Sequence, residues 1–417
     1  MDLREKKFPL TPDFRLRALQ WAQKFPYACY LNGHDYSLPY GPFPEVLATG
    51  MDSENPDHIF SGPGRCYGFF GYEAKFSPGP FQASGHGPGF PDCVFFRASH
   101  EIRFLGDVVT VCSDSPDQVW EEISSAPVFL PQSLTSPSFR AETSQQEYLQ
   151  KVEQILDLIR EGWVYELNFC QFFEKAQAIC GLSVWLKLNE CMPMPFSGWL
   201  KFPGFEIASA SPERFLKKEG NKLISQPIKG TAKRGKTPEE DALSKAALLQ
   251  SEKERAENLM IVDLVRNDLS SVSQIGSVCV EELFGIYAYP SVFQMISTIV
   301  STLDPRIGSL EAIAAAFPMG SMTGAPKKEV MRRIAALESR KRGPFSGAMG
   351  YADAGGNFDF NVLIRSVFTD HKAGKTFFGV GSAITIDALP GPEWEECGIK
   401  AGRILEVFGE DWQDLFR

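Results

Sequence analysis

The sequence predicts an α+β fold in which antiparallel β-sheets pack face to face and helices lie outside. Two observations favour this class. Long stretches of helical periodicity alternate with short runs rich in β-branched and aromatic residues. Two of these runs, 101–105 and 108–112, are separated only by Gly106-Asp107, which is typical of a tight hairpin. Hairpins join antiparallel strands, whereas parallel strands need long crossover connections, so a doubly wound sheet is not expected.

Three regions follow one another along the chain. Residues 1–112 form an N-terminal β-rich region with many Phe, Tyr, Gly and Pro, in which further strands are expected at 66–70 and 93–96. Residues 113–143 hold prolines scattered among serines, and we expect them to be a connecting segment. The remainder, 144–417, carries the helices and motifs on which a function can be argued.

Helix starts are well marked in this third region. Residues 144–147 (Ser-Gln-Gln-Glu) form a capping box, and apolar residues then recur at helical spacing until Gly162. Thr237 and Pro238 open a second helix, as an N-cap and a first-turn proline do. Residues 251–254 (Ser-Glu-Lys-Glu) form a capping box for a third helix.

Residues 226–235 are expected to form a rigid turn, here called the elbow, which holds Lys229 in a fixed position. Pro227 fixes its own φ and Gly230 permits unusual backbone conformations, so the side chain of Lys229 is aimed. Upstream, residues 205–215 are expected to form a strand that ends in a polar turn carrying Glu213. The two side chains then face one pocket, or else they are an exposed Glu and a solvated Lys on a β-hairpin.

Two carboxylates on two helices are candidate metal ligands. Glu257 shares the apolar face of its helix with Met260 and Ile261, so it points inward and needs a partner, either a basic side chain or a metal ion. Glu396 lies in an acidic helical segment that also suits the helix dipole without any metal. Magnesium usually takes one or two protein carboxylates and completes its coordination with water and substrate oxygens.

A glycine-bracketed loop, 320–327, runs into a further helix and offers free N–H groups that can bind an anion. It lacks the G-x-x-x-x-G-K-[ST] pattern of a P-loop, so it is either an anion site or only a turn.

Composition narrows the class of partner. The chain has 417 residues, of which 43% are hydrophobic and 23% charged, with a net charge of −10. Nucleic acid and anionic membrane are therefore not expected as main partners. The nine cysteines are scattered without a C-x-x-C pair, which favours buried thiols in a reducing compartment. With no apolar run of about 18 residues and a polar N-terminus, the protein is expected to be cytoplasmic.

Six blocks, in order, carry a resemblance to a known family. They are SASPERF with PIKGTAKRG (209–215 and 227–235), 256–268, 317–327, 345–351, 361–365 and 393–400. These blocks resemble the chorismate-utilising enzymes, and within them the group of aminodeoxychorismate synthase component I. The resemblance covers about residues 145–410, and the first third resembles the family only loosely, through residues 68–72. It implies an anthranilate synthase component I-like fold.

The resemblance also implies roles for individual residues. It implies that Lys229 and Glu213 are catalytic residues. It also implies that Glu257 and Glu396 bind Mg²⁺. The substrate-binding set is Gly230, Thr231, Ser321, Tyr351, Arg365, Gly379, Gly381 and Lys400. The implied mechanism is covalent: Lys229 attacks C2 of chorismate, Glu213 protonates the leaving C4 hydroxyl, and ammonia then enters at C4 and expels the lysine. This requires that burial lower the pKa of Lys229 while keeping Glu213 protonated.

Two positions discriminate within the family. Anthranilate synthase-like sequences have alanine where this chain has Lys229, and water-using relatives have lysine where this chain has Glu166. Both favour formation of 4-amino-4-deoxychorismate, for 4-aminobenzoate and folate synthesis, with ammonia from a separate glutamine amidotransferase subunit. The alternatives are an anthranilate synthase component I and a non-catalytic chorismate-binding subunit. The chain departs from the family at Glu166, usually Gln, and at Gln294, usually His.

Overall fold

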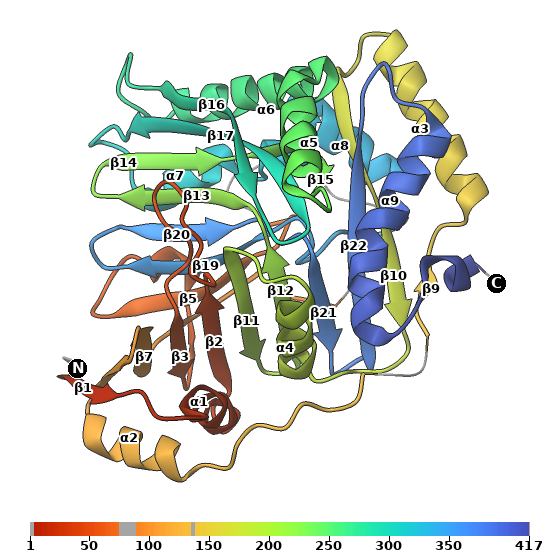
Figure 1. Ribbon diagram of the computed structural model, residues 1–417. Helices are drawn as coiled ribbons and strands as arrows, with labels where there is room; N and C mark the ends of the chain where they lie inside the picture. Colours follow the sequence, from red (N-terminus) through yellow and green to blue (C-terminus); the bar gives the residue numbers. More distant parts are fainter. Residues whose placement is uncertain (1–3, 75–88, 135–137, 417) are drawn as a thin grey trace.

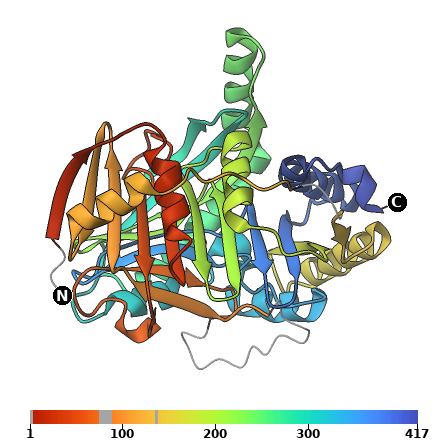
Figure 2. The same ribbon diagram turned by 90° about the horizontal axis from the view of Figure 1, so that it is seen from below.

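The computed structural model describes residues 4–74, 89–134 and 138–416. Over these ranges the chain forms one sheet of 12 strands and one of 10, with helices on the outside (Figures 1 and 2). All the strand pairs assigned there are antiparallel. The predicted α+β class is confirmed.

The first sheet follows this spatial order: β1 (Arg4–Pro9), β8 (Val108–Ser113), β7 (His100–Leu105), β3 (Val46–Gly50), β2 (Tyr27–Asn32), β11 (Phe196–Phe202), β12 (Phe205–Ser211), β21 (Ser366–Asp370), β22 (Lys375–Ile384), β10 (Glu166–Lys175) and β18 (Gly324–Ala325), with β9 (Arg140–Ala141) also paired to β10.

The second sheet follows this order: β15 (Ile228–Lys233), β17 (Val292–Thr302), β14 (Lys222–Gln226), β13 (Arg214–Glu219), β20 (Phe358–Asn361), β19 (Ala348–Asp353), β5 (Arg65–Phe70), β6 (Cys93–Arg97) and β4 (Ser53–Glu54), with β16 (Cys279–Ala288) also paired to β17. The strands of residues 1–112 are thus distributed over both sheets.

The helices are α1 (Phe14–Ala22), α2 (Pro116–Ser125), α3 (Gln145–Arg160), α4 (Gly181–Cys191), α5 (Pro238–Gln250), α6 (Glu252–Ser270), α7 (Ser309–Ala316), α8 (Lys327–Leu337) and α9 (Pro390–Leu405). Short 3₁₀ turns occur at Pro56–His58, Gly320–Met322, Glu406–Phe408 and Trp412–Phe416. Across the described ranges, no helix combines the length and the apolar character needed to span a bilayer.

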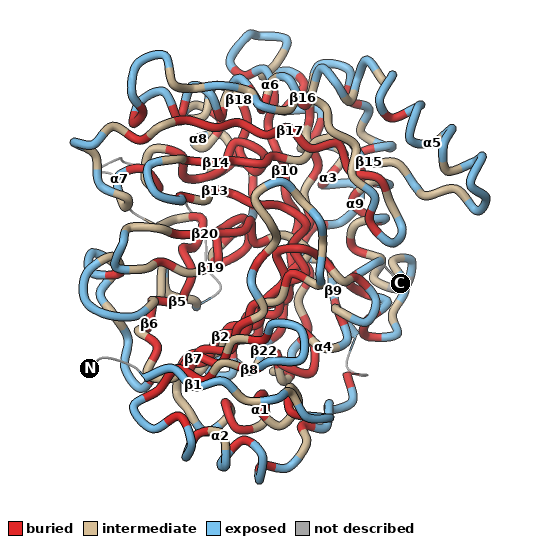
Figure 3. The backbone as a smooth tube through the Cα atoms, turned by 60° about the vertical axis from the view of Figure 1, so that its left-hand side comes forward, coloured by how far each residue is buried: buried red, intermediate tan, exposed pale blue. Residues whose placement is uncertain are grey.

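Two apolar clusters fill the space between these layers. One lies between the first sheet and the helices α1, α3, α4 and α9, and the other lies between the two sheets and continues beneath α6 and α7. Neighbouring strand residues alternate between them, as Leu47 and Ala48 do, because successive side chains point to opposite faces. The sheets approach closely: a Cβ on Gly198 would lie 2.7 Å from Met349 Cε. Figure 3 shows the buried strands at the centre and the exposed α5 at the edge.

Several local predictions are confirmed. The β7–β8 hairpin turns at Gly106 with φ 56°. Both halves of the Ser144–Glu147 capping box are present at α3, and Thr237 and Ser251 each accept a hydrogen bond at the start of α5 and α6. The helices α1 and α2 are not anticipated by the strand patterns, and α2 begins at Pro116 inside the expected connecting segment. The expectation of buried thiols is wrong for Cys191 and Cys279, which are exposed.

Two short crossings between the sheets position the site. The chain leaves β12 in the first sheet and enters β13 in the second through Pro212 and Glu213. It returns from β20 to β21 through residues 362–365. The crossings run side by side, since Val362 N donates to Glu213 O at 3.0 Å and Ala210 N donates to Arg365 O at 3.1 Å. The expected single strand over 205–215 is therefore divided between two sheets.

Candidate active site

Lys229 lies in an irregularity of β15. Pro227 separates β14 from β15, and the register of β15 on β17 shifts between Ile228 and Thr231, so Lys229 and Gly230 are displaced from the regular ladder. Gly230 has φ 97°, and a Cβ there would lie 3.1 Å from Glu254 Oε2. The predicted elbow is confirmed, with the addition that it opens a strand. A non-glycine residue at 230 would be strained in this conformation.

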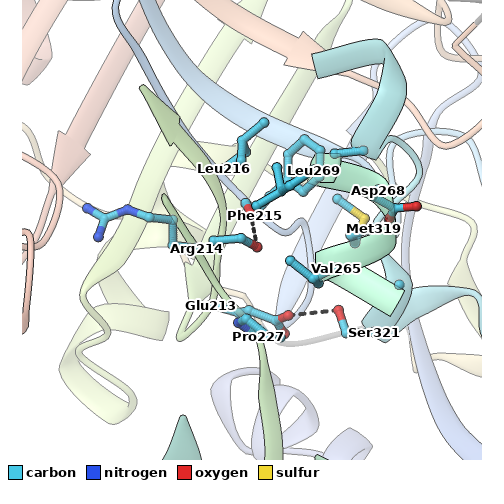
Figure 4. A pocket seen from close by; sticks show the side chains of 13 residues that line it. Glu213, Arg214, Phe215, Leu216, Pro227, Val265, Asp268, Leu269, Met319 and Ser321 are labelled. Carbon is cyan, nitrogen blue, oxygen red and sulfur yellow. Dashed lines mark hydrogen bonds between the residues drawn. The ribbon is translucent and has the colours of Figure 1, made fainter. Parts of the chain in front are cut away.

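Glu213 is buried at the crossing between the sheets, with 4% of its surface exposed. Burial raises the pKa of Glu213 to about 7, although the hydrogen bond from Ser321 and the charge of Lys229 oppose this rise. Ser321 Oγ donates to Glu213 Oε1 at 2.7 Å (Figure 4). A pKa raised in this way is compatible with the predicted role of Glu213 as a general acid.

A small cavity of about 10 Å³ lies beside Glu213, between β13 and α6, with room for roughly one water (Figure 4). Asp268 lines it, and Lys327 Nζ donates to Asp268 Oδ2 at 2.5 Å. A larger groove of about 780 Å³ runs past Tyr27, Phe95 and Phe202 and is lined by none of the predicted site residues. The predicted site residues thus lie away from this larger groove.

Glu166 is the ion-pair partner of Lys229. Lys229 Nζ donates to Glu166 Oε1 at 2.7 Å, and the two side chains are only 10% and 1% exposed. Burial lowers the pKa of Lys229, but the charges of Glu166, Glu257 and Glu396 raise it more, so it lies above its usual value. The prediction that desolvation keeps Lys229 neutral is therefore wrong for this state of the protein: Lys229 is an ammonium group.

Two helices contribute further carboxylates to the site, in two pairs. Glu254 and Glu257 lie one turn apart on α6, and Glu393 and Glu396 lie one turn apart on α9. Burial raises the pKa of Glu257 to about 7, and it raises the pKa values of Glu254 and Glu393 as well. The pKa of Glu396 is lowered, because Lys400 Nζ lies 2.6 Å from its Oε1 and outweighs the effect of burial.

Sequence reasoning missed three of these side chains as members of the site. Glu254 and Glu393 each stand three residues before a predicted ligand, and this spacing places them on the same helical face, so the signal was present. Glu166 lies on β10 and meets Lys229 only through the packing of the two sheets. No local spacing connects residues 166 and 229.

Glu257 and Glu396 suit a hard divalent cation by donor type, since both offer carboxylate oxygens. Both also act electrostatically on the same ammonium group, that of Lys229. Within the described ranges, no three side chains of His, Cys, Asp or Glu are grouped tightly enough to hold a metal alone.

Basic side chains approach the site from α9 and its neighbouring crossing. Lys400 Nζ donates to Gly381 O at 2.8 Å as well as pairing with Glu396. Arg365 has φ 52° and donates from Nη1 to Lys400 O at 3.4 Å. Burial, aided by the charge of Arg403, lowers the pKa of Arg365 to about 10. A partly desolvated guanidinium held by a backbone carbonyl is suited to receive a ligand carboxylate.

The remaining predicted residues divide into those near Lys229 and those that pack elsewhere. Thr231 Oγ1 donates to Gln294 Oε1 at 2.9 Å on the neighbouring strand. Tyr351 instead lies against Arg65 and Tyr67, at 5.1 Å from the guanidinium and 6.1 Å between rings.

Gly379 faces the core, where a Cβ would lie 2.7 Å from the ring of Phe345. The structure therefore brings together Lys229, Glu213, Ser321, Glu257, Glu396, Lys400, Arg365, Gly230, Thr231 and Gly381, but shows Tyr351 and Gly379 in packing contacts.

Comparison with known proteins gives a consistent result. The model of the chorismate binding enzyme family matches residues 16–406. A probable chloroplastic aminodeoxychorismate synthase of Oryza sativa subsp. japonica is 40% identical over 288 residues, which are 68% of this chain and 32% of that protein. Aminodeoxychorismate synthase component 1 of Klebsiella aerogenes is 37% identical over 286 residues, 69% of this chain and 63% of that protein. The chain thus spans about one third to two thirds of the length of these relatives.

Solved structures of similar fold extend over nearly the whole chain. Anthranilate synthase component I from Streptococcus pneumoniae has a TM-score of 0.76 and 24% identity, with 97% of this chain and 92% of that chain covered. The menaquinone-specific isochorismate synthase from Escherichia coli has a TM-score of 0.77 and 16% identity, with 97% and 94% covered. At this level of identity the likeness concerns the fold, and it confirms the expected anthranilate synthase component I-like architecture.

Proposed function

The chain belongs to the chorismate binding enzyme family, and from that premise we propose that it converts chorismate and ammonia to 4-amino-4-deoxychorismate, as an aminodeoxychorismate synthase component I. The observation that carries the proposal is that a buried lysine and a buried acid lie close enough to interact electrostatically: Lys229 on β15 and Glu213 at the crossing between the sheets. Anthranilate synthase-like sequences carry alanine at the position of Lys229, so the lysine favours attack at C2 and amination at C4.

The contacts of the resting site suggest a balanced sequence of steps. Lys229 passes one proton to Glu166 Oε1, 2.7 Å away, and the resulting amine bonds to C2 of chorismate. The C4–O bond breaks with its electron pair, Glu213 supplies the proton, and water leaves. The product of this half is a secondary ammonium at Lys229, with Glu166 protonated and Glu213 ionised.

The second half restores the enzyme. The lone pair of ammonia bonds to C4, and the C2–N bond breaks with its electrons returning to Lys229 as a neutral amine. The new C4 ammonium gives a proton to Glu213, and Glu166 returns its proton to Lys229. The net change is chorismate plus ammonia to aminodeoxychorismate plus water.

We further propose that Glu257 and Glu396 hold Mg²⁺, which would anchor a substrate carboxylate and offset the negative charge that keeps Lys229 protonated. Arg365 and Lys400 are the proposed partners of the substrate's other anionic groups. A separate glutamine amidotransferase subunit is the proposed source of ammonia, a cytoplasmic enzyme is the proposed setting, and 4-aminobenzoate and folate synthesis is the proposed pathway.

Product analysis tests the proposal directly. Purified protein is incubated with chorismate, MgCl₂ and ammonium chloride, and the products are separated and identified by mass spectrometry. We expect aminodeoxychorismate, with the enolpyruvyl group retained. Fluorescent anthranilate as the main product would instead establish an anthranilate synthase, and chorismate binding without any turnover would establish a non-catalytic subunit.

A further inference from the structure

The small cavity beside the acid lies where three parts of the site meet. It has a volume of about 10 Å³ and is bounded by the crossing at Glu213, by Pro227 in the elbow and by Ser321 in the glycine-bracketed loop. Helix α6 closes another side with Val265 and Asp268 (Figure 4). The first three parts carry the proposed acid, the turn that holds the proposed nucleophile and a predicted substrate-binding residue. A molecule held in the cavity is therefore next to the reacting groups.

The hydroxyl groups that line the cavity have already donated their hydrogens elsewhere. Ser321 Oγ donates to Glu213 Oε1 at 2.7 Å. Ser225 Oγ donates to Phe215 O at 2.8 Å. Both serines line the cavity and are buried, with 6% of Ser321 and 7% of Ser225 exposed. Each hydroxyl oxygen keeps a lone pair, so it can still accept a hydrogen bond but cannot donate a second one.

The charged side chains of the lining are acceptors or are turned away. Asp268 is a carboxylate whose Oδ2 accepts a hydrogen bond from Lys327 Nζ at 2.5 Å. The guanidinium of Arg214 points away from the cavity in Figure 4 and is bound to Asp359. Glu213 gives up its proton in the first half of the proposed reaction and then becomes a further acceptor. In the second half, the described side chains of the lining therefore offer acceptors and no free hydrogen.

Ammonia suits such a lining better than water does. It has more hydrogens to donate than water and only a single lone pair. Acceptors around the cavity engage the hydrogens and leave that lone pair without a partner. A free lone pair is what nucleophilic attack on carbon requires. Ammonia is also close to water in size, so it matches the volume of the cavity.

We propose that the cavity between β13 and α6 is the binding site for ammonia, the nitrogen nucleophile of the second half-reaction. This inference rests on the proposed function, because it assigns the place from which the amino donor of that reaction attacks. Glu213 protonates the oxygen that leaves C4, so a neighbour of Glu213 is also a neighbour of C4. From the cavity, the lone pair of ammonia bonds to C4 and the C2–N bond returns its electrons to Lys229. The new C4 ammonium then gives a proton to Glu213.

A change of cavity volume tests the assignment without altering the reacting groups. Val265→Ile adds one methylene to the wall of the cavity and should crowd ammonia. Initial rates are measured with ammonium chloride varied at constant pH and ionic strength, in saturating chorismate and MgCl₂. We expect the KM for ammonium to rise about tenfold, as for one methylene in a tight pocket, while the KM for chorismate changes less than about twofold.

Val262→Ile is the matched control. Val262 lies one turn earlier on α6 and is buried in the same apolar cluster, but it does not line the cavity. The same added methylene therefore reports the effect of overpacking α6 alone. The KM for ammonium of this variant should equal that of the wild type.

Val265→Ala changes the cavity in the opposite direction. Loss of both methyl groups of the valine enlarges the cavity, so methylamine should then be accepted as a nucleophile. The product is an N-methyl aminodeoxychorismate, heavier than aminodeoxychorismate by one CH₂, and mass spectrometry detects it. At the same concentration of methylamine, the wild type should form at most a trace of this product.

The outcomes separate this inference from the proposed function. If the wild type makes no aminodeoxychorismate from chorismate and ammonium, the proposed function fails and the inference fails with it. If the wild type is active and Val265→Ile keeps the wild-type KM for ammonium, only the inference is overturned, and the cavity is a structural water site. A KM for ammonium that rises only together with that for chorismate also overturns it. Should Val265→Ile not fold, Val265→Ala decides, since no gain of methylamine product overturns the inference.

Discussion

Ser321 Oγ donates a hydrogen bond of 2.7 Å to Glu213 Oε1, and this contact opposes the effect of burial on the acid. The pKa of Glu213 is raised to about 7 even with that hydrogen bond present, because burial disfavours the ionised form more strongly. Ser321 therefore limits, together with Lys229, how far burial raises the pKa of Glu213.

Ser321→Ala should move the alkaline limb of the pH–rate profile upward. Glu213 must be protonated to act, so activity of the wild type should fall as pH rises through about 7. Without the hydroxyl that favours the carboxylate, the acid holds its proton to higher pH, by up to about one unit for a hydrogen bond of about 1.4 kcal/mol. The measurement is kcat/KM for chorismate between pH 5.5 and 9, and an unmoved limb would contradict the role of Ser321.

Glu213→Gln should abolish activity yet stabilise the fold. The unfolded chain ionises Glu213 above about 4.5, whereas the native state keeps the proton until about 7, so ionisation favours unfolding between these values. The glutamine variant lacks this effect. Its stability advantage over the wild type should therefore grow from pH 4.5 to 7 and stay constant above, reaching about 3 kcal/mol at roughly 1.36 kcal/mol per pKa unit.

Urea unfolding of Glu213→Gln and wild type at pH 5 and pH 8 measures this difference. Equal advantages at the two pH values would show that Glu213 is not a buried acid with a raised pKa. Glu219→Gln, in the same β13 segment but exposed, is a control that should show no such dependence.

Lys229→Arg should keep the ion pair and lose the chemistry. Arginine can still pair with Glu166, but it stays charged at any working pH and cannot attack C2. We expect chorismate binding within a few-fold of wild type and a loss of activity of at least about 10³-fold, as for removal of a nucleophile. If Lys229→Arg forms aminodeoxychorismate at a rate comparable to that of the wild type, Lys229 acts only through its charge.

The same lysine should be found bonded to substrate in the wild type. With chorismate and Mg²⁺ present and ammonia withheld, the peptide holding residues 227–233 should gain the mass of chorismate less water. The adduct should be absent from Lys229→Arg and should disappear from the wild type when ammonium is added. A persistent adduct that ammonium does not discharge would mark a dead-end product instead of an intermediate.

Glu257→Gln and Glu396→Gln should each remove activity while leaving the fold intact. A glutamine is isosteric but binds Mg²⁺ more weakly than a carboxylate, and Glu257 already carries a burial cost that the neutral side chain avoids. Activity is titrated with MgCl₂, and both variants should need at least tenfold more metal or show no saturation.

Asp263→Asn is the control for these variants, since Asp263 lies on the exposed side of α6 and pairs with Arg266. It should titrate as wild type does. Full activity of the wild type in the presence of a chelator would show that the reaction needs no metal ion.

The parts of the fold that could be predicted are those with local signals. The capping box before α3, the N-caps of α5 and α6 and the hairpin at Gly106 each depend on residues within a few positions of one another. The division of residues 205–215 between two sheets has no such signal. It depends on the pairing of the crossing at Glu213 with residues 362–365, far away in the sequence.

The charge state of Lys229 could not be predicted for the same reason. The mechanism implied by the resemblance required burial of Lys229, and burial alone lowers the pKa of a lysine. The sign of the shift is decided by Glu166 on β10, Glu257 on α6 and Glu396 on α9, which meet only in the folded protein. Single residues of the site were visible in the sequence, but their mutual distances were not.

The interleaving of early and late strands has a consequence for how the chain acquires its structure. Phe70 on β5 pairs with Ala348 on β19, and Leu31 on β2 pairs with Gly198 on β11. Contacts between such distant segments close long loops, so a nascent chain cannot complete the second sheet before β20 or the first sheet before β22 has been synthesised. Until then, the first 112 residues present open strand edges, and chaperones that shield such edges would protect the chain during synthesis.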